Sequence, residues 1–410
     1  MNSEFCIPVS IARRSFPTFK LETRNQKPET IKRVIYLDNN ATTAIASEVR
    51  ETMLPFLGSE FGNPSSAHSA GQAAREAIDN SRTSVARLLG ADPEEIAFTS
   101  GGTESDNWAI RAALDLAPQK KHIITTRVEH EAVRKLCEKY ERDGYRVSWL
   151  DVDGEGSLDL DQLRDLLSDD TAIVSVMLAN NETGVLFPVE EAAAIVKEGS
   201  GALFHVDGVN AVGKIPVELG SGSIDLFSIS AHKFHGPKGI GALYIRRGVE
   251  VPSFAIGGGQ ESGRRAGTEA VHQIAGLGAA ADLVRDMTAM ENVRALRDKL
   301  ENSILERIPI ASVNGDPGRR LPNTSNISFE NLNGEALLAF LDDAGICVST
   351  GSACNAGDHS PSAVLQAMDI PYSKAMGSIR FSLGRFNTED EIDITIAALE
   401  DATGKVARFG

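Results

Sequence analysis

A lysine in a short loop, Lys233, has the setting expected for covalent chemistry. It lies in the run Ser230-Ala-His-Lys-Phe-His-Gly-Pro-Lys, and two apolar stretches, 224–230 and 240–245, flank the loop. Such stretches are typical of buried strands, so the loop between them leaves the lysine at a strand end. An amine placed there can form a Schiff base with a carbonyl compound. A solvated loop lysine is the alternative that this segment alone leaves open.

A run of small residues, Ser100-Gly-Gly-Thr-Glu-Ser, lies between a predicted strand at 96–99 and a helical stretch that begins near Asp106. A turn of this kind exposes backbone N–H groups at the positive end of a helix dipole, which favours a phosphate. The run has neither the Gly-x-x-x-x-Gly-Lys spacing of a Walker loop nor the Gly-x-Gly-x-x-Gly spacing of a dinucleotide fold. A glycine turn that merely begins a helix remains an alternative.

Two further polar side chains follow predicted strands. Asp207 ends the run Phe204-His-Val-Asp, where an unpaired carboxylate is costly and therefore needs a cation. A protonated ring nitrogen is one candidate, and a helix cap or a buried salt bridge are the alternatives. His130 follows the apolar stretch 122–126. Its imidazole can transfer protons near neutral pH and can stack on a ring, although an isolated histidine is more often structural.

These features occur in order on successive strand ends. A phosphate cup, a stacking histidine, a carboxylate for a ring nitrogen and an amine for a Schiff base are the parts that a pyridoxal 5′-phosphate site requires. Each part alone is a weak signal. Their joint occurrence predicts that this chain binds that cofactor.

A cysteine among small residues adds a candidate nucleophile. Cys354 lies in Thr350-Gly-Ser-Ala-Cys-Asn-Ala-Gly, and we expect an exposed, mobile loop there. An exposed thiol is more reactive than one packed among apolar neighbours. Cys347, beside Ile346 and Val348, and Cys137, on a predicted helix, fit the packed kind.

Short apolar strands alternate with helical stretches from residue 34 onward, for example strands at 96–99, 122–126, 146–150, 171–177 and 202–206. This alternation predicts an α/β fold with a mostly parallel sheet between helices. From about 280 the pattern changes to a long charged helix, expected over 279–308, and then to mixed strands and helices. We expect a large domain at 34–279, a smaller α+β domain at 280–410, and a flexible basic arm at 1–33.

Composition excludes several classes of partner. The 410 residues include 41 Lys and Arg against 57 Asp and Glu, a formal net charge of −16, which disfavours nucleic acid and anionic membranes. Four cysteines without zinc spacing predict no metal site and a reducing, cytoplasmic location. An organellar presequence within 1–33 is the alternative to a flexible arm.

The chain resembles the group I cysteine desulfurases of nitrogen fixation and iron–sulfur assembly, which are fold-type I, class V aminotransferase-like pyridoxal-phosphate enzymes. The resemblance runs from about residue 36 to 384. Its motifs are Tyr36-Leu-Asp-Asn-Asn-Ala-Thr-Thr, Gly62-Asn-Pro-Ser-Ser, Thr99-Ser-Gly-Gly-Thr-Glu-Ser, Asn180-Asn-Glu-Thr-Gly, Ser230-Ala-His-Lys, Arg265-Ala-Gly-Thr, Gly351-Ser-Ala-Cys and Ile379-Arg-Phe-Ser-Leu-Gly.

The resemblance implies a role for each candidate residue. Lys233 would hold the cofactor, His130 would stack on its ring, and Asp207 would pair with the ring nitrogen. The remaining contacts would be Gly102, Thr103, Ser230 and His232 at the phosphate, joined by Thr268 from the second subunit of a homodimer, Asn181 and Asn210 near the ring hydroxyl, and Arg380 at the substrate carboxylate. Asn210 replaces the family's usual Gln, which implies a contact through water.

The resemblance also implies the reaction. L-cysteine would displace Lys233, whose amine would remove the α-proton. The Cys354 thiolate would then take the sulfur, leaving L-alanine and a persulfide for an acceptor protein of unknown identity, as in iron–sulfur cluster assembly or tRNA thiolation. The run after Cys354 departs from the family pattern, so the acceptor stays open. A selenocysteine lyase or another C–S lyase is the first alternative, and a non-enzymatic scaffold of the same fold is the remote one.

Overall fold

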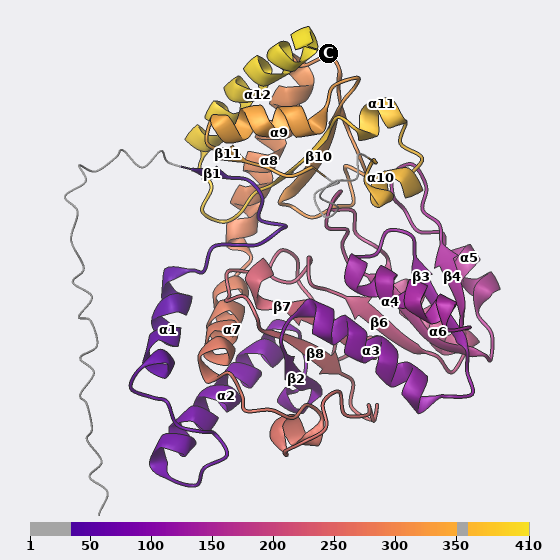
Figure 1. The fold of residues 1–410 in the computed structure, drawn as a ribbon, viewed down its shortest axis with the longest axis vertical. Coiled ribbons are helices and arrows are strands. Elements are labelled where there is room, and N and C mark those ends of the chain that lie inside the picture. Colours follow the sequence, from indigo (N-terminus) through magenta and orange to yellow (C-terminus); the bar gives the residue numbers. More distant parts are fainter. Residues whose placement is uncertain (1–33, 351–359, 410) are drawn as a thin grey trace, which may run out of the picture. The chain divides into compact units, whose positions relative to one another are not determined.

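A mixed sheet of seven strands lies at the centre of the computed structural model, which describes residues 34–350 and 360–409 (Figure 1). Its strand order is β2-β8-β7-β6-β5-β3-β4. β8 is antiparallel to both of its neighbours, and every other pair is parallel. The strands are β2 (Ile96–Thr99), β3 (His122–Thr126), β4 (Arg146–Leu150), β5 (Thr171–Met177), β6 (Leu203–Asp207), β7 (Leu226–Ser230) and β8 (Gly241–Ile245). The predicted α/β fold with a mostly parallel sheet is confirmed.

Helices cover both faces of this sheet because successive strand residues point to opposite sides. In β3, Ile124 packs into a core with α2 and α6, whereas Ile123 packs into another with α3 and α4. Sheets buried on both faces read as continuous apolar runs, as these strands do. The helices of this part are α1 (Ser47–Leu57), α2 (Ser69–Leu88), α3 (Gly102–Leu116), α4 (Glu131–Arg142), α5 (Leu160–Leu166), α6 (Val189–Gly199) and α7 (Val271–Val284), with 3-10 turns η1 (Pro93–Glu95), η2 (Ala231–Lys233) and η3 (Gln260–Gly263).

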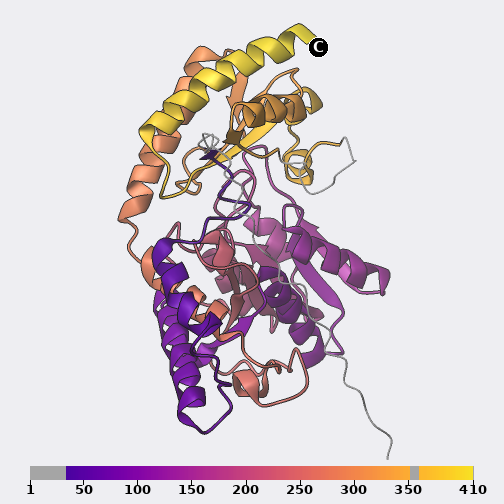
Figure 2. The ribbon, with the colours of Figure 1, turned by 60° about the vertical axis from the view of Figure 1, so that its left-hand side comes forward.

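A smaller antiparallel sheet, of order β12-β10-β9, lies with helices of the C-terminal part (Figure 2). A separate apolar core joins this sheet to α8, α9 and α12, and it also takes in Ile35 and Leu37 from the N-terminal segment. From Val34 onward the chain forms one compact unit, so a domain boundary at 280 stays a prediction. The elements are β9 (Ala311–Val313), β10 (Thr324–Phe329), β12 (Ser378–Ser382), α8 (Thr288–Arg307), α9 (Gly334–Asp343), α10 (Ala363–Ala367), α11 (Tyr372–Ala375), α12 (Glu389–Phe409) and the parallel pair β1 (Ile35–Tyr36) and β11 (Ile346–Cys347).

The single long helix predicted over 279–308 is wrong. The structure has two helices there, because α7 ends at Val284 and α8 begins at Thr288. The Asp286 carboxylate accepts a hydrogen bond from the Thr288 backbone N–H at 2.9 Å, which satisfies a free donor at the start of the second helix. A short acidic side chain before a new helical stretch was the local signal for this break.

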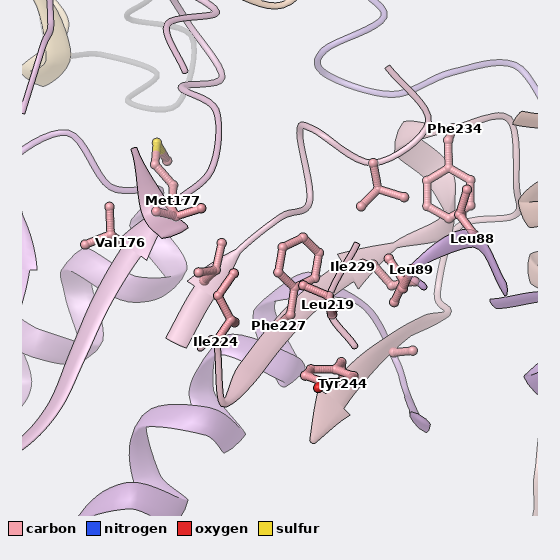
Figure 3. Close-up of a cluster of buried hydrophobic side chains, with 14 of the residues drawn as sticks. Leu88, Leu89, Val176, Met177, Leu219, Ile224, Phe227, Ile229, Phe234 and Tyr244 are labelled. Carbon is pink, nitrogen blue, oxygen red and sulfur yellow. The ribbon is translucent and has the colours of Figure 1, made fainter. Parts of the chain in front are cut away.

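Large apolar side chains pack tightly beneath the strand ends (Figure 3). Phe227 lies so close to Gly208 that a Cβ there would come within 1.9 Å of the ring. Phe234 is packed in the same way against Gly213, whose φ of +78° also favours glycine. These contacts fix the turn that follows Asp207 and the turn that carries Lys233.

Candidate active site

One pocket lies where β2, β3, β5, β6 and β7 end. These strands run in the same direction, so their carboxyl ends meet at one edge of the sheet, where open α/β sheets bind ligands. The pocket measures about 220 Å³. It brings together most of the predicted cofactor residues and is lined by Ala41, Gly102, Thr103, Asp106, His130, Met177, Ala179, Asn181, Asp207, Val209, Asn210, Ser230, His232 and Lys233.

The N-terminus of α3 forms one wall. Gly101 precedes it with φ +146°, and a Cβ on Gly102 would lie 2.7 Å from a methyl carbon of Val209. Glycine therefore brings the helix start close to the loop after Asp207 and leaves its first N–H groups facing the pocket wall. Burial lowers the pKa of His232 beside this wall to about 4, with Lys233 adding to the effect, so its imidazole is neutral at pH 7.

Asp207 is buried at the end of β6, with 6% of its surface exposed. Its Oδ1 accepts a hydrogen bond from the Val209 backbone N–H at 2.9 Å. Burial raises the pKa of Asp207, and His130 and Lys233 act in the opposite direction. A carboxylate in this setting is stabilised by a cation, and the pairing of Asp207 with a ring nitrogen stays a prediction.

Three buried ionisable groups behind Asp207 were missed by the sequence analysis. Burial raises the pKa of Asp106, and it raises the pKa of Glu129 to about 8, with Asp207 adding to both shifts. His205 is neutral because burial lowers its pKa to about 3, and its Nε2 lies 3.6 Å from Asp106. Asp106 follows Gly102 by four residues on one face of α3, which is the signal that could have found it.

Lys233 lies in η2, the turn that follows β7. Its amine donates a hydrogen bond to the backbone carbonyl of Asn40. Asn40 is 1% exposed, and its backbone N–H donates to Ser382 Oγ at 2.9 Å. The N-terminal segment and β12 therefore position the acceptor that holds this amine.

His130 caps the start of α4. Its Nδ1 accepts a hydrogen bond from the Ala132 backbone N–H at 3.2 Å. In the neutral ring this leaves the proton on Nε2. The imidazole is exposed at the pocket, where it can stack on a bound ring or transfer a proton.

Arg380 lies next to the pocket wall rather than in it. It donates to the Asn181 carbonyl at 2.9 Å and to Asp38 Oδ1 at 2.6 Å, while its buried Nε has no hydrogen-bond partner among the described residues. Both terminal nitrogens of this guanidinium are thus held by protein oxygens beside the pocket. Asp38, which the sequence analysis did not single out, fixes the orientation of this guanidinium.

Two of the predicted site residues, Thr268 and Asn210, are placed differently from the others. Thr268 is exposed and does not line the pocket of its own chain. Asn210 lines the pocket, but its Oδ1 accepts from Lys214 at 2.7 Å and its Nδ2 donates to the Asn180 carbonyl at 3.2 Å. Cys354 and the segment 1–33 lie outside the described residues.

Within residues 34–350 and 360–409, no three His, Cys, Asp or Glu side chains are grouped so that they could hold a metal ion. No helix of the described chain is long and apolar enough to span a membrane.

The pocket residues fit pyridoxal 5′-phosphate. The α3 N-terminus, Ser230 and neutral His232 offer donors for a phosphate, and Gly102 leaves no side chain in the way. Asp207 supplies the buried carboxylate for a protonated ring nitrogen, and Lys233 supplies the amine. The donor set thus matches what a phosphorylated heteroaromatic aldehyde requires.

The comparison with known proteins agrees with this site. A family model described as class-V aminotransferase matches residues 35–395. A cysteine desulfurase from Trichormus azollae is 54% identical over 370 residues, which are 90% of this chain and 92% of that protein. The solved structure of a NifS-like protein has a TM-score of 0.86 at 38% identity, covering 91% of this chain and 100% of its own.

A further structure, titled SspA in complex with cysteine, has a TM-score of 0.77 at 33% identity over 86% of this chain and 100% of its own. The chain belongs to the class-V aminotransferase family, and within it to the NifS-type cysteine desulfurases.

Proposed function

We propose that this protein is a pyridoxal-phosphate-dependent cysteine desulfurase that converts L-cysteine to L-alanine and leaves the sulfur as a persulfide on Cys354. The observation that carries the proposal is the meeting of Lys233, Asp207, His130 and the α3 N-terminus in one pocket. The similarity to the Trichormus azollae enzyme supports the choice of substrate.

Each pocket residue has a part in this reaction. Lys233 would hold the cofactor through its amine, and this amine, once free, would accept the substrate α-proton. Asp207 would pair with the protonated ring nitrogen, and His130 would stack on the ring and transfer protons through Nε2. When bound, the cofactor withdraws electrons from the substrate and so allows its carbon–sulfur bond to break.

Arg380 orients the substrate. Asp38 and the Asn181 carbonyl hold its two terminal nitrogens beside the pocket, where the guanidinium charge would attract the substrate carboxylate. A rotationally fixed arginine places the substrate α-carbon with little loss of entropy on binding. The related structure that contains cysteine supports a site for this amino acid.

Sulfur transfer is the step assigned to Cys354. Its thiolate attacks the substrate sulfur, a sulfur–sulfur bond forms, and the carbon–sulfur bond breaks with its electron pair moving to the three-carbon fragment. Protonation of that fragment gives L-alanine, so no external oxidant or reductant is required. The persulfide would then pass to an acceptor protein, for which iron–sulfur cluster assembly and tRNA thiolation both stay open.

We also propose a homodimer that acts in the cytoplasm. Thr268 lies away from the pocket of its own chain, on the exposed loop after η3. The phosphate donors of each pocket would be completed by Thr268 of the partner subunit. A Thr268→Ala variant is then expected to hold the cofactor less tightly without a change in the fold.

The test is peptide mass mapping of the purified holoenzyme after brief exposure to L-cysteine. We expect Cys354 to gain one sulfur atom while alanine appears. Cys354→Ala should abolish persulfide formation. Cys137→Ala is the matched control and should leave it unchanged, since Cys137 is fully buried and burial raises the pKa of its thiol.

The alternatives make different predictions in the same experiment. If cysteine is consumed while Cys354 stays unmodified and Cys354→Ala remains active, the protein is a C–S lyase. If selenocysteine alone is consumed, it is a selenocysteine lyase. If the protein fails to bind the cofactor, it is a scaffold.

A further inference from the structure

A second buried lysine, Lys214, lies beside the pocket and has no part in the proposed reaction. Only 6% of its surface is exposed. Its amine donates to Asn210 Oδ1 at 2.7 Å and to Asn40 Oδ1 at 3.0 Å. Both acceptors are neutral amides, and none of the ion pairs among the described residues joins Lys214 to a carboxylate.

The two residues whose amide side chains bind Lys214 connect it to the pocket through hydrogen bonds. Asn40 receives the Lys233 amine on its backbone carbonyl, and its Nδ2 donates to the carbonyl of Asn181 at 3.2 Å. Asn210 itself lines the pocket. Lys214 is therefore one hydrogen-bonded residue away from the amine expected to hold the cofactor.

A buried amine is costly, and an apolar side chain could fill the same space. Burial lowers the pKa of Lys214 well below its usual value, and the charges of Lys233 and Arg380 lower it further. Two of the N–H donors of this amine meet the two amide acceptors. The remaining charged or titratable side chains facing it line a small cavity of about 20 Å³ that both lysines share, namely His235, Asp286 and Arg385.

We propose that Lys214 is a positioning residue for Lys233. It fixes the Asn40 side chain, so that the Asn40 carbonyl holds the Lys233 amine at the pocket, and it fixes Asn210 in the pocket wall. The proposal rests on the proposed function for the covalent role of Lys233. Its experimental readout depends only on cofactor binding, so the two can fail separately.

The test uses Lys214→Met in the full chain with bound pyridoxal 5′-phosphate and no substrate. Visible absorption as a function of pH reports the protonation of the linkage between Lys233 and the cofactor. We expect the midpoint to fall by about one pH unit or more, because the Asn40 carbonyl that accepts from the Lys233 nitrogen loses its fixed position and stabilises the protonated form less. Lys214→Gln, which keeps an N–H donor without a charge, should restore part of the shift.

Lys197→Met is the matched control. Lys197 lies on α6 and donates to the buried Asp225 at 2.7 Å. Its loss should lower the urea midpoint of unfolding and leave the absorption titration unchanged. If Lys214→Met does not fold, the Gln variant is compared with wild type directly.

An unchanged absorption midpoint in both Lys214 variants would overturn the proposal. A shift in Lys214→Met without any rescue by Gln would assign the effect to charge and not to positioning, which also contradicts it. If the wild-type protein shows the titration but forms no persulfide, the proposed function fails while the result for Lys214 stands.

Discussion

Two regions of this molecule differ in whether their buried carboxyl oxygens have hydrogen-bond partners. Around the pocket, Asp106 Oδ1 and Glu129 Oε2 are buried and have no hydrogen-bond partner among the described residues. Burial raises the pKa of both carboxyls. In the core of the C-terminal part, both carboxylate oxygens of Glu301 are bonded to Arg320, at 2.7 and 2.5 Å, and Ser325 donates to one of them.

The pKa values of the buried carboxyls are shifted in opposite directions in the two regions. Burial alone raises the pKa of Glu301, but hydrogen bonds from Arg320 and Ser325 outweigh it, and the pKa is lowered overall. The charge of Glu301 has its partner within the chain, whereas the partner of Asp207 is the expected ligand. Raised pKa values of buried carboxyls in a pocket thus mark the functional region.

The largest effect on stability is expected from removing Arg320 from its pair with Glu301. Arg320→Met leaves Glu301 buried without its cation, and breaking a buried pair typically costs about 3–5 kcal/mol of unfolding free energy. Urea unfolding of the variant measures this loss. The double variant Glu301→Leu/Arg320→Met removes both charges and should recover most of it. A single variant as stable as wild type would show that Glu301 and Arg320 do not depend on each other.

Sequence reasoning identified the residues that chemistry requires but not those that hold them. Asp207 and Lys233 could be found because one ends an apolar strand and the other lies in the turn that follows one. Lys214 and Asn40 could not be found, since they are 174 residues apart and meet only in the folded chain. Arg380 was named from the sequence, but its contact with Asp38, 342 residues away, could not be.

The fold was predictable to a similar degree. Apolar runs with strand length gave the sheet, because both of its faces are covered by helices. The break between α7 and α8 was missed, since the charged pattern continues across it and the start of α8 is marked only by the hydrogen bond from the Thr288 backbone N–H to Asp286. The inclusion of Ile35 and Leu37 in the C-terminal core depends on pairing between β1 and β11, which no local pattern shows.

The next largest effect is expected at the pocket, from removing the charge of Asp207. Asp207→Asn keeps an oxygen for the Val209 backbone N–H but removes the charge that a protonated ring requires. We expect activity to fall about a hundredfold to a thousandfold, as measured by alanine formation. Without the cofactor, urea unfolding should show no loss of stability, because the variant avoids burying a carboxylate. A loss of unfolding free energy as large as that of Arg320→Met would mean that the charge of Asp207 stabilises the fold, as that of Glu301 does.

Glu182 combines a raised pKa, like the carboxyls around the pocket, with a nearby arginine, like Glu301. Its variant should have the smallest effect. It accepts a hydrogen bond from Ser362 and lies near Arg380, yet burial raises its pKa from 4.5 to about 7. The folded state therefore binds the proton more tightly than the unfolded state, and stability is lost as pH rises from about 4.5 to about 7. The loss amounts to about 3 kcal/mol at most.

Glu182→Gln keeps an oxygen for Ser362 and cannot ionise, so its unfolding free energy should lack this decline between about pH 4.5 and about pH 7. Urea unfolding of wild type and variant across this range gives the difference directly, and Ser362→Ala controls for the loss of the hydrogen bond alone. Parallel curves for wild type and Glu182→Gln would mean that Arg380 pairs with Glu182 as Arg320 pairs with Glu301. A widening gap at high pH would instead mean that the charge of Arg380 is left to Asp38 and to the substrate, as the proposed function requires.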